Sequence, residues 1–127
     1  MDKEEIKKLK QAGKVASQVV EFAKNLIKKD MELLEIAEKI EEKILSLNAK
    51  PAFPVSLAIN EIAAHSTPSY NDNSIANGLL KVDIGVHIDG FIADTAFSID
   101  LEKSEENKRL IEIAELALKN AVEKIIF

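Results

Sequence analysis

Two neighbouring stretches of the sequence, 79–87 and 91–98, alternate between apolar and polar residues on either side of the dipeptide Asp89-Gly90. Alternation with a period of two is typical of β-strands that bury one face. Asp-Gly suits the positive φ angles of a two-residue hairpin turn. This segment constrains the fold more than any other, because it predicts two antiparallel strands in one fixed register.

The predicted register places two aspartates, Asp83 and Asp94, on one face of the hairpin. With a two-residue turn, Asp83 lies opposite Ala96 and Asp94 lies opposite Gly85. Diagonal neighbours of this kind lie about 7 Å apart at the backbone, so both carboxylates can reach a common centre, and the two small residues leave room for it. The other face is mostly apolar and is expected to meet the core; it carries Val82, Ile84, Val86, Ile88, Phe91, Ala93, Thr95 and Phe97.

The closeness of the two carboxylates has more than one explanation. Two unpaired like charges repel, so one of them would have to be protonated unless a cation lay between them. A divalent metal ion, or a pair of them, would satisfy both groups. Two simpler arrangements stay open: the aspartates face water on the open side of a half-exposed sheet, or one of them pairs with Lys81.

Three other segments show the apolar spacing of three and four residues that indicates amphipathic helices. The first runs from Glu4 to Lys28. The second is expected to have Asp30 as its N-cap, since aspartate is favoured there, and to end near Asn48. The third is expected to follow Ser104 as its N-cap and to continue to the last residues.

The segment between the second helix and the hairpin is expected to be extended or irregular. The prolines of PAFP (51–54) exclude a helix interior, and SLAIN (56–60) is interpreted as a short strand. PSYNDNSIANG (68–78) is dense in turn-forming residues and predicts a surface loop. The expected fold class is therefore α+β, with helices covering one face of a small antiparallel sheet.

Length and composition limit the chain to one domain or part of one. Its 127 residues, 46% apolar and 31% charged, suit a single core. Cysteine is absent, so disulfides, zinc–thiolate clusters and thiol nucleophiles are excluded. The charged N-terminus and the lack of a run of about 18 apolar residues lead us to expect a cytoplasmic protein with no membrane partner.

Charge is distributed unevenly along the chain. The net charge is -5, yet residues 1–30 contain more lysines than acidic residues. A basic first helix could contact RNA or a ribosome surface, because clustered cations release phosphate counterions on binding. The simpler interpretation, a solvated face that keeps the protein soluble, stays open.

The stretch KVDIGVHIDGFIADTAF (81–97), together with PAFPVSLAINEIAAHSTP (51–68), resembles the N-terminal half of a methionine aminopeptidase of the type II class found in archaea and eukaryotes. The resemblance implies half of a pita-bread fold, in which two related α+β halves enclose two divalent metal ions. It also implies an enzyme that removes methionine from the N-termini of peptides and nascent proteins. Residues 1–127 would then form one partial domain, and the helix at about 105–127 would open the second half.

Four residues acquire roles through this resemblance. Asp83 matches the first metal-ligating aspartate, and Asp94 matches the aspartate that bridges both metals. His65, in AAHSTP, resembles the active-site histidine, which contacts the scissile peptide and stabilises the tetrahedral intermediate without binding metal. Phe53, in PAFP, resembles an aromatic wall of the methionine pocket, while Ser66 stands where the family usually has tyrosine. Cobalt, manganese, iron and zinc all suit a ligand set of this kind.

The resemblance further implies that one histidine and two glutamates of the site come from a second half, which would be the rest of a longer chain, a separate chain or a second copy of this one. His87 and Asp89 are expected to be ordinary turn residues. Three other hypotheses stay open: a pita-bread binding module without catalysis, a structural half that needs a partner, and another hydrolase of the fold, such as a proline-specific aminopeptidase or creatinase.

Overall fold

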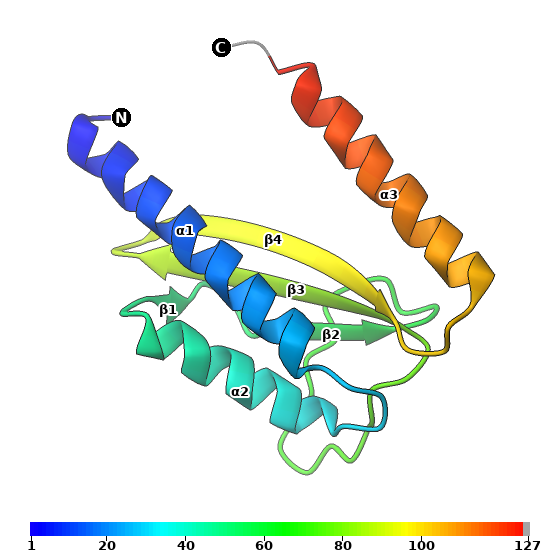
Figure 1. The fold of residues 1–127 in the computed structure, drawn as a ribbon. Helices are drawn as coiled ribbons and strands as arrows, with labels where there is room; N and C mark the ends of the chain where they lie inside the picture. The colour runs from blue at the N-terminus through cyan, green and yellow to red at the C-terminus, as the bar shows by residue number, and fades with distance from the viewer. Residues whose placement is uncertain (126–127) are drawn as a thin grey trace.

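The computed structural model describes residues 1–125, which contain three helices and four strands (Figure 1). No helix in this part of the chain combines the length and the apolar character needed to cross a membrane. In chain order, the elements are α1 (Lys3–Leu26), α2 (Leu33–Ser46), β1 (Lys50–Pro51), β2 (Ser56–Ile59), β3 (Leu79–Ile88), β4 (Phe91–Asp100) and α3 (Glu105–Glu123).

β3 is the central strand of an antiparallel sheet. β4 pairs with one edge of β3 along its whole length, while β1 and β2 pair with different parts of the other edge. Helices α1 and α2 pack against each other and against the sheet (Figure 1). The predicted α+β class, with helices covering one sheet face, is confirmed.

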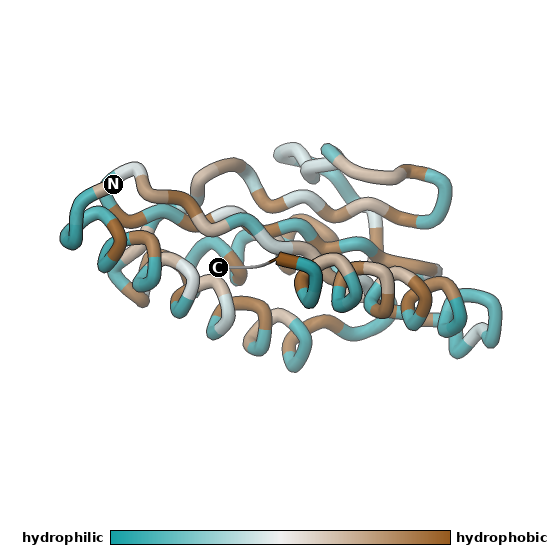
Figure 2. The backbone as a smooth tube through the Cα atoms, turned by 90° about the horizontal axis from the view of Figure 1, so that it is seen from above, coloured by the Kyte–Doolittle hydropathy of each residue, from teal (hydrophilic) through white to brown (hydrophobic). Residues whose placement is uncertain are grey.

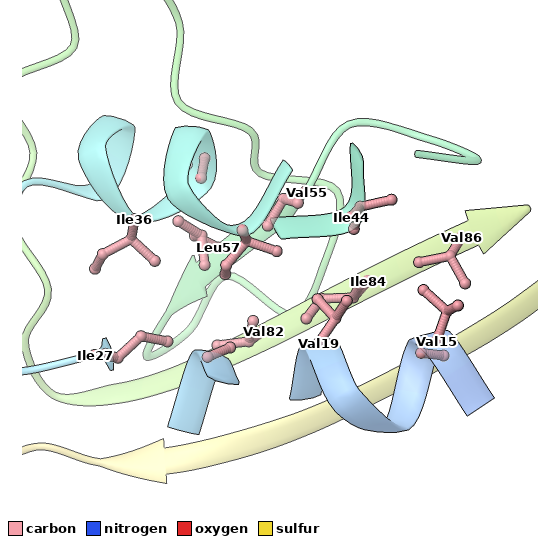
Figure 3. Packing of buried hydrophobic residues seen from close by; sticks show 14 of the residues in the cluster. Val15, Val19, Ile27, Ile36, Ile44, Val55, Leu57, Val82, Ile84 and Val86 are labelled. Carbon is pink, nitrogen blue, oxygen red and sulfur yellow. The ribbon is translucent and has the colours of Figure 1, made fainter. Parts of the chain in front are cut away.

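The core lies between α1, α2 and the sheet (Figure 3). Val82, Ile84 and Val86 alternate along β3 and are fully buried, as the pattern predicted. Complete burial of an aliphatic side chain of this size stabilises a fold by about 1.5–3 kcal/mol, so these residues determine which sheet face turns inward. The buried residues packed with them include Val15, Val19, Ile36, Ile44 and Leu57.

The β3–β4 hairpin has the predicted turn and register. Asp89 and Gly90 have φ angles of 50° and 87°, and two successive positive values are what a type I′ turn requires. Each aspartate also faces the small residue predicted for it: Asp83 pairs with Ala96, and Asp94 pairs with Gly85. The side chains that alternate with the buried valines are therefore left on the opposite sheet face.

The predicted N-cap of the second helix was wrong. α2 begins at Leu33, and Asp30 lies before it with a left-handed φ of 68°. The N–H of Leu33 donates to the carbonyl of Ser74 at 2.9 Å, and the N–H of Asp30 donates to the carbonyl of Ala76 at 2.8 Å. Because the returning loop supplies backbone acceptors to this helix end, no capping carboxylate is needed.

α3 has its predicted N-cap but packs little against the rest of the described chain. The Oγ of Ser104 accepts the N–H of Asn107 at 3.3 Å. The helix ends at Glu123, earlier than predicted, and residues 126–127 lie outside the described part. No residue of α3 is buried within residues 1–125, and hydrophobic positions recur along it (Figure 2). Five of its large apolar side chains are 52% to 65% exposed; they are Leu110, Ile113, Leu116, Leu118 and Val122.

Candidate metal centre

Asp83 and Asp94 lie on the same face of the sheet as diagonal neighbours across the β3–β4 pair. Asp83 is half-buried and Asp94 is exposed. On the other side of β3, Ser56 of β2 pairs directly with Asp83, so its side chain lies on the same face. Three strands therefore contribute neighbouring polar side chains to this part of the sheet.

A cavity of about 450 Å³ lies over these side chains. Its lining brings together all four residues singled out from the sequence, although they come from segments far apart along the chain. The lining residues are Phe53, Pro54, Ser56, His65, Thr67, Asp83 and Asp94.

The surroundings of Asp83 disfavour its charged form. Burial contributes most to raising the pKa of Asp83, the neighbouring Asp94 raises it further, and His65 acts in the opposite direction. The Oδ1 atom of Asp83 is buried and has no hydrogen-bond partner among the described residues. A buried carboxylate oxygen without a partner costs free energy unless a proton or a cation compensates for it.

Lys81 does not supply the compensating cation. Its Nζ donates to the backbone carbonyl of Asn60, and burial lowers the pKa of the Lys81 ammonium. Water can reach Asp94, which is exposed, but the Oδ1 atom of Asp83 is shielded from it. Neither Lys81 nor solvent therefore compensates for the unpartnered oxygen, whereas a cation between the carboxylates or a proton on Asp83 would do so.

The two aspartates fit a divalent metal ion, because carboxylate oxygens are ligands that hard cations favour. They form only a partial ligand set. Within residues 1–125, no group of three or more metal-ligating side chains lies together. A metal ion at this pair would take its further ligands from outside residues 1–125 or from water.

The ring of Phe53 covers Gly85, the cross-strand partner of Asp94. A Cβ atom on Gly85 would lie 2.2 Å from Cε1 of Phe53, far inside van der Waals contact. The expectation that Gly85 leaves room for a shared centre of the carboxylates needs correction, since an aromatic ring takes that space. Phe53 instead forms an apolar wall of the cavity beside the aspartates.

His65 lies in a loop that hydrogen bonds to β2. Its φ angle is 57°, a left-handed value that is uncommon for residues other than glycine. The next residue, Ser66, accepts the N–H of Leu57 at 2.7 Å and donates its own N–H to the Oγ of Ser56 at 3.0 Å. Ser56 was not singled out from the sequence, because its hydrogen-bond partner Ser66 lies in a loop ten positions later. The only indication was that Ser56 belongs to the predicted strand SLAIN.

His87, near the end of β3, and Asp89, in the turn, are outside the cavity lining. The Nδ1 of His87 accepts the N–H of Gly90 at 3.1 Å, and Asp89 pairs with Lys8 of α1 at 2.9 Å. Both contacts stabilise the hairpin end and its packing against α1. The expected turn position is confirmed for Asp89, whereas His87 lies in β3 and contacts the turn through its side chain.

Comparison with known proteins shows which protein family this chain resembles. The profile of metallopeptidase family M24 matches residues 7–126. A methionine aminopeptidase of Methanothermus fervidus is 45% identical over a region covering 94% of this chain and 71% of its own length. A methionine aminopeptidase of Pyrococcus abyssi is 50% identical over 93% of this chain, which is 40% of its own length. The chain thus spans less than half of the second relative.

Solved structures share the fold. A methionine aminopeptidase from Rickettsia prowazekii superposes with a TM-score of 0.82 at 26% identity, covering 94% of this chain and 51% of that one. A prolidase from Pyrococcus furiosus superposes with a TM-score of 0.78 at 27% identity, covering 95% of this chain and 37% of that one. The α+β arrangement is thus that of the pita-bread enzymes. Because the family profile matches nearly the whole sequence, the chain belongs to metallopeptidase family M24.

Proposed function

We propose that this protein is a metal-dependent aminopeptidase that removes methionine from the N-termini of peptides and nascent proteins. The observation that carries the proposal is the buried, unpartnered Oδ1 of Asp83 beside Asp94, in a cavity that His65 and Phe53 also line. The relatives that are 45% and 50% identical are methionine aminopeptidases, which supports this choice of reaction.

Asp83 and Asp94 would hold the metal, as a pair of divalent ions of cobalt, manganese, iron or zinc. When bound, such ions supply Lewis-acid polarisation of the peptide carbonyl and make a water molecule more acidic. The aspartates contribute negative charge from two adjacent strands. Because Asp83 is partly desolvated, its attraction for a cation is stronger than that of a carboxylate in water.

His65 and Phe53 would act on the substrate directly. An imidazole N–H at the cavity can donate to the scissile peptide and to the oxygen on which negative charge develops. The ring of Phe53 offers an apolar, polarisable surface to a thioether side chain. The carboxylates, the imidazole and the aromatic wall therefore have distinct tasks within one cavity.

Other hydrolases share this fold, so the fold by itself does not identify the substrate. The prolidase of Pyrococcus furiosus has a similar structure, and a proline-specific aminopeptidase is the competing hypothesis. At 27% identity the prolidase is more distant from this chain than the methionine aminopeptidase of Pyrococcus abyssi, at 50%. The apolar wall formed by Phe53 also suits methionine. We therefore favour methionine at the first position of the substrate.

The remaining metal ligands, and the polypeptide that covers the site, would come from a second half of the domain. The proposal treats residues 1–127 as one partial domain, with α3 as the first helix of that half. Two observations support it: α3 has no buried residue within the described chain, and the aspartate pair lacks a third ligand there. The second half would be further polypeptide of the same protein, another chain, or a second copy of this one.

A cytoplasmic location near the ribosome is part of the same proposal, because nascent proteins are the expected substrates. Four lysines on α1 support it: Lys3, Lys7, Lys10 and Lys14 are exposed and recur at helical spacing on one side of the helix. None of them forms an ion pair with a described residue. Cosedimentation with ribosomes that weakens steeply as salt rises would support this contact, and cosedimentation unaffected by charge reversal of these lysines would contradict it.

Peptide hydrolysis by the protein purified from its own cells tests the function. Two tripeptides are compared: Met-Ala-Ser, which begins with methionine, and Ala-Pro-Ser, which has proline at its second position. We expect Mn²⁺-dependent release of methionine from the first, no cleavage of the second, and loss of activity when EDTA removes the metal. Cleavage of Ala-Pro-Ser alone would favour the proline-specific alternative. No cleavage of either peptide, with metal present, would favour the non-catalytic binding module.

A further inference from the structure

Ser56 is the polar residue that the fold buries most completely in the described part of the chain, with 4% of its surface exposed. It lies on the sheet face that carries Asp83, and it lines the same cavity as His65. A buried hydroxyl needs a hydrogen-bond partner. The Oγ of Ser56 meets this need by accepting the N–H of Ser66 at 3.0 Å.

This hydrogen bond controls the backbone next to His65. The N–H of Ser66 belongs to the peptide unit that directly follows His65, so holding that N–H in place restricts the ψ angle of His65. On the same residue, the carbonyl of Ser66 accepts the N–H of Leu57 at 2.7 Å. Ser66 is therefore tied to β2 through both of its backbone polar groups.

His65 needs such an anchor because its backbone is strained. A left-handed conformation costs a residue with a side chain on the order of 1–2 kcal/mol, and it persists only where the surroundings hold it. Residues 61–65 are all exposed, so little packing restrains this side of the loop. A second anchor, from the Thr67 hydroxyl to the carbonyl of Val55 at 3.2 Å, lies one residue further along.

We propose that Ser56 is a positioning residue for His65: its hydroxyl holds the N–H of Ser66 and thereby the left-handed backbone that keeps the imidazole at the cavity of the two aspartates. The proposal rests on the proposed function, which gives His65 its task. Ser56 acts through His65, so its contribution should disappear when the imidazole is absent.

A double-mutant cycle tests this dependence in the assembled protein. Ser56→Ala should lower kcat for Met-Ala-Ser about tenfold or more while KM changes less than about twofold, since a misplaced group loses transition-state contacts. Ser56→Thr keeps the hydroxyl and should restore most of the activity. In a His65→Ala background, Ser56→Ala should cause no further loss. Ser69→Ala is the matched control, because it removes an exposed hydroxyl from the same loop.

Two results of the cycle would overturn the proposal. Ser56→Ala with unchanged kcat would show that the hydroxyl does not position a working group. An equal loss in the presence and absence of the imidazole would show that Ser56 acts by another route, such as general stability of the strand.

Amide hydrogen exchange and histidine NMR signals of the metal-free chain keep this test separate from the proposed function. The Ser66 amide should be protected in the unmodified protein. In Ser56→Ala that protection should be lost and the ring signals of His65 should shift, whereas Ser69→Ala should change neither. If the Ser66 amide of the unmodified protein exchanges as fast as one in an unstructured peptide, the positioning role is wrong. If protection and shifts behave as expected but no aminopeptidase activity is found, the function is wrong and the positioning role stands.

Discussion

At the scale of single residues, the ionisation of Asp83 affects both the stability of the fold and the attraction of the site for a cation. Burial and the neighbouring Asp94 raise the pKa of Asp83, so its ionised form weakens the folded state. This penalty is absent below the unfolded pKa of about 3.9, grows as the pH rises from there, and is complete above the folded pKa. Above its folded pKa the metal-free chain therefore has the full penalty, and a bound cation would remove it.

Asp94→Asn is predicted to stabilise the metal-free chain at neutral pH, because it removes the charge closest to Asp83. In the assembled protein, saturating Mn²⁺ should stabilise the unmodified form by about 2.7 kcal/mol at a hundredfold excess over Kd, and should stabilise the variant much less. Thermal unfolding with EDTA and with Mn²⁺ measures both effects. Glu42→Gln, which neutralises an exposed carboxylate on α2, is the control and should change neither. Equal stabilisation of all three proteins by metal would exclude Asp94 as a ligand.

Gly85→Ala is predicted to destabilise the chain by about 1–3 kcal/mol, because the added methyl group meets the Phe53 ring at 2.2 Å and the ring must move. It should also raise KM for methionine peptides. Gly13→Ala is the matched control: no atom lies within 4 Å of the new Cβ, and alanine should stabilise α1 by about 0.5–1 kcal/mol. Urea denaturation compares the two. Unchanged stability of Gly85→Ala would mean that the ring does not rest on the glycine.

At the scale of elements, the sequence predicted those features that depend on residues close together along the chain, such as the turn and the strand pairing of the hairpin. The Asp89-Gly90 turn alone gave the hairpin register and so the juxtaposition of Asp83 and Asp94. The N-cap at Asp30 was wrong because the acceptors for that helix end lie on the loop at 74–76, more than forty positions away. Ser56 was missed for the same reason, since its role depends on where a later loop returns. Long-range contacts of this kind leave no local pattern in the sequence.

The start of α3 is predicted to weaken in acid. Hydrogen bonds from the Asn107 side chain and from the N–H groups of Glu102 and Ser104 lower the pKa of Asp100. A carboxyl with a lowered folded pKa contributes stability that is present above its unfolded pKa and is lost as the pH falls through the folded pKa. The protection factors of the Glu102 and Ser104 amides, which correct for the intrinsic pH dependence of exchange, should therefore fall below about pH 4. In Asp100→Asn the amides of Glu102 and Ser104 should exchange quickly at every pH. If they are as well protected at pH 7 as in the unmodified chain, this account is wrong.

At the scale of the whole molecule, the two sides of the described chain differ in how much apolar surface they bury. One face of the sheet is buried under α1 and α2, whereas α3 exposes a broad apolar surface and the aspartate pair lacks further ligands within the described residues. The apolar face of an amphipathic helix is normally buried against another part of the structure. Composition and periodicity predicted α3 as a helix, but only the structure shows that its apolar side chains remain exposed.

Leu110→Glu is predicted to leave the folding of the chain unchanged within about 0.5 kcal/mol, because this side chain is already 52% exposed. It should weaken association with whatever covers α3, since a charge would be buried there. Native mass spectrometry and denaturant unfolding of the same samples separate the two effects. Lys119→Glu, on the polar side of the helix, is the control. A variant that assembles as well as the unmodified protein would show that this face is not covered.

The central claim is that Asp83 and Asp94 together hold a divalent metal. The most direct measurement is anomalous X-ray diffraction from crystals of the assembled protein grown with Mn²⁺. We predict anomalous density within ligand distance of both carboxylates, including the Oδ1 of Asp83 that has no partner in residues 1–125. Density elsewhere, or none at all with that oxygen hydrogen bonded to protein, would contradict the account.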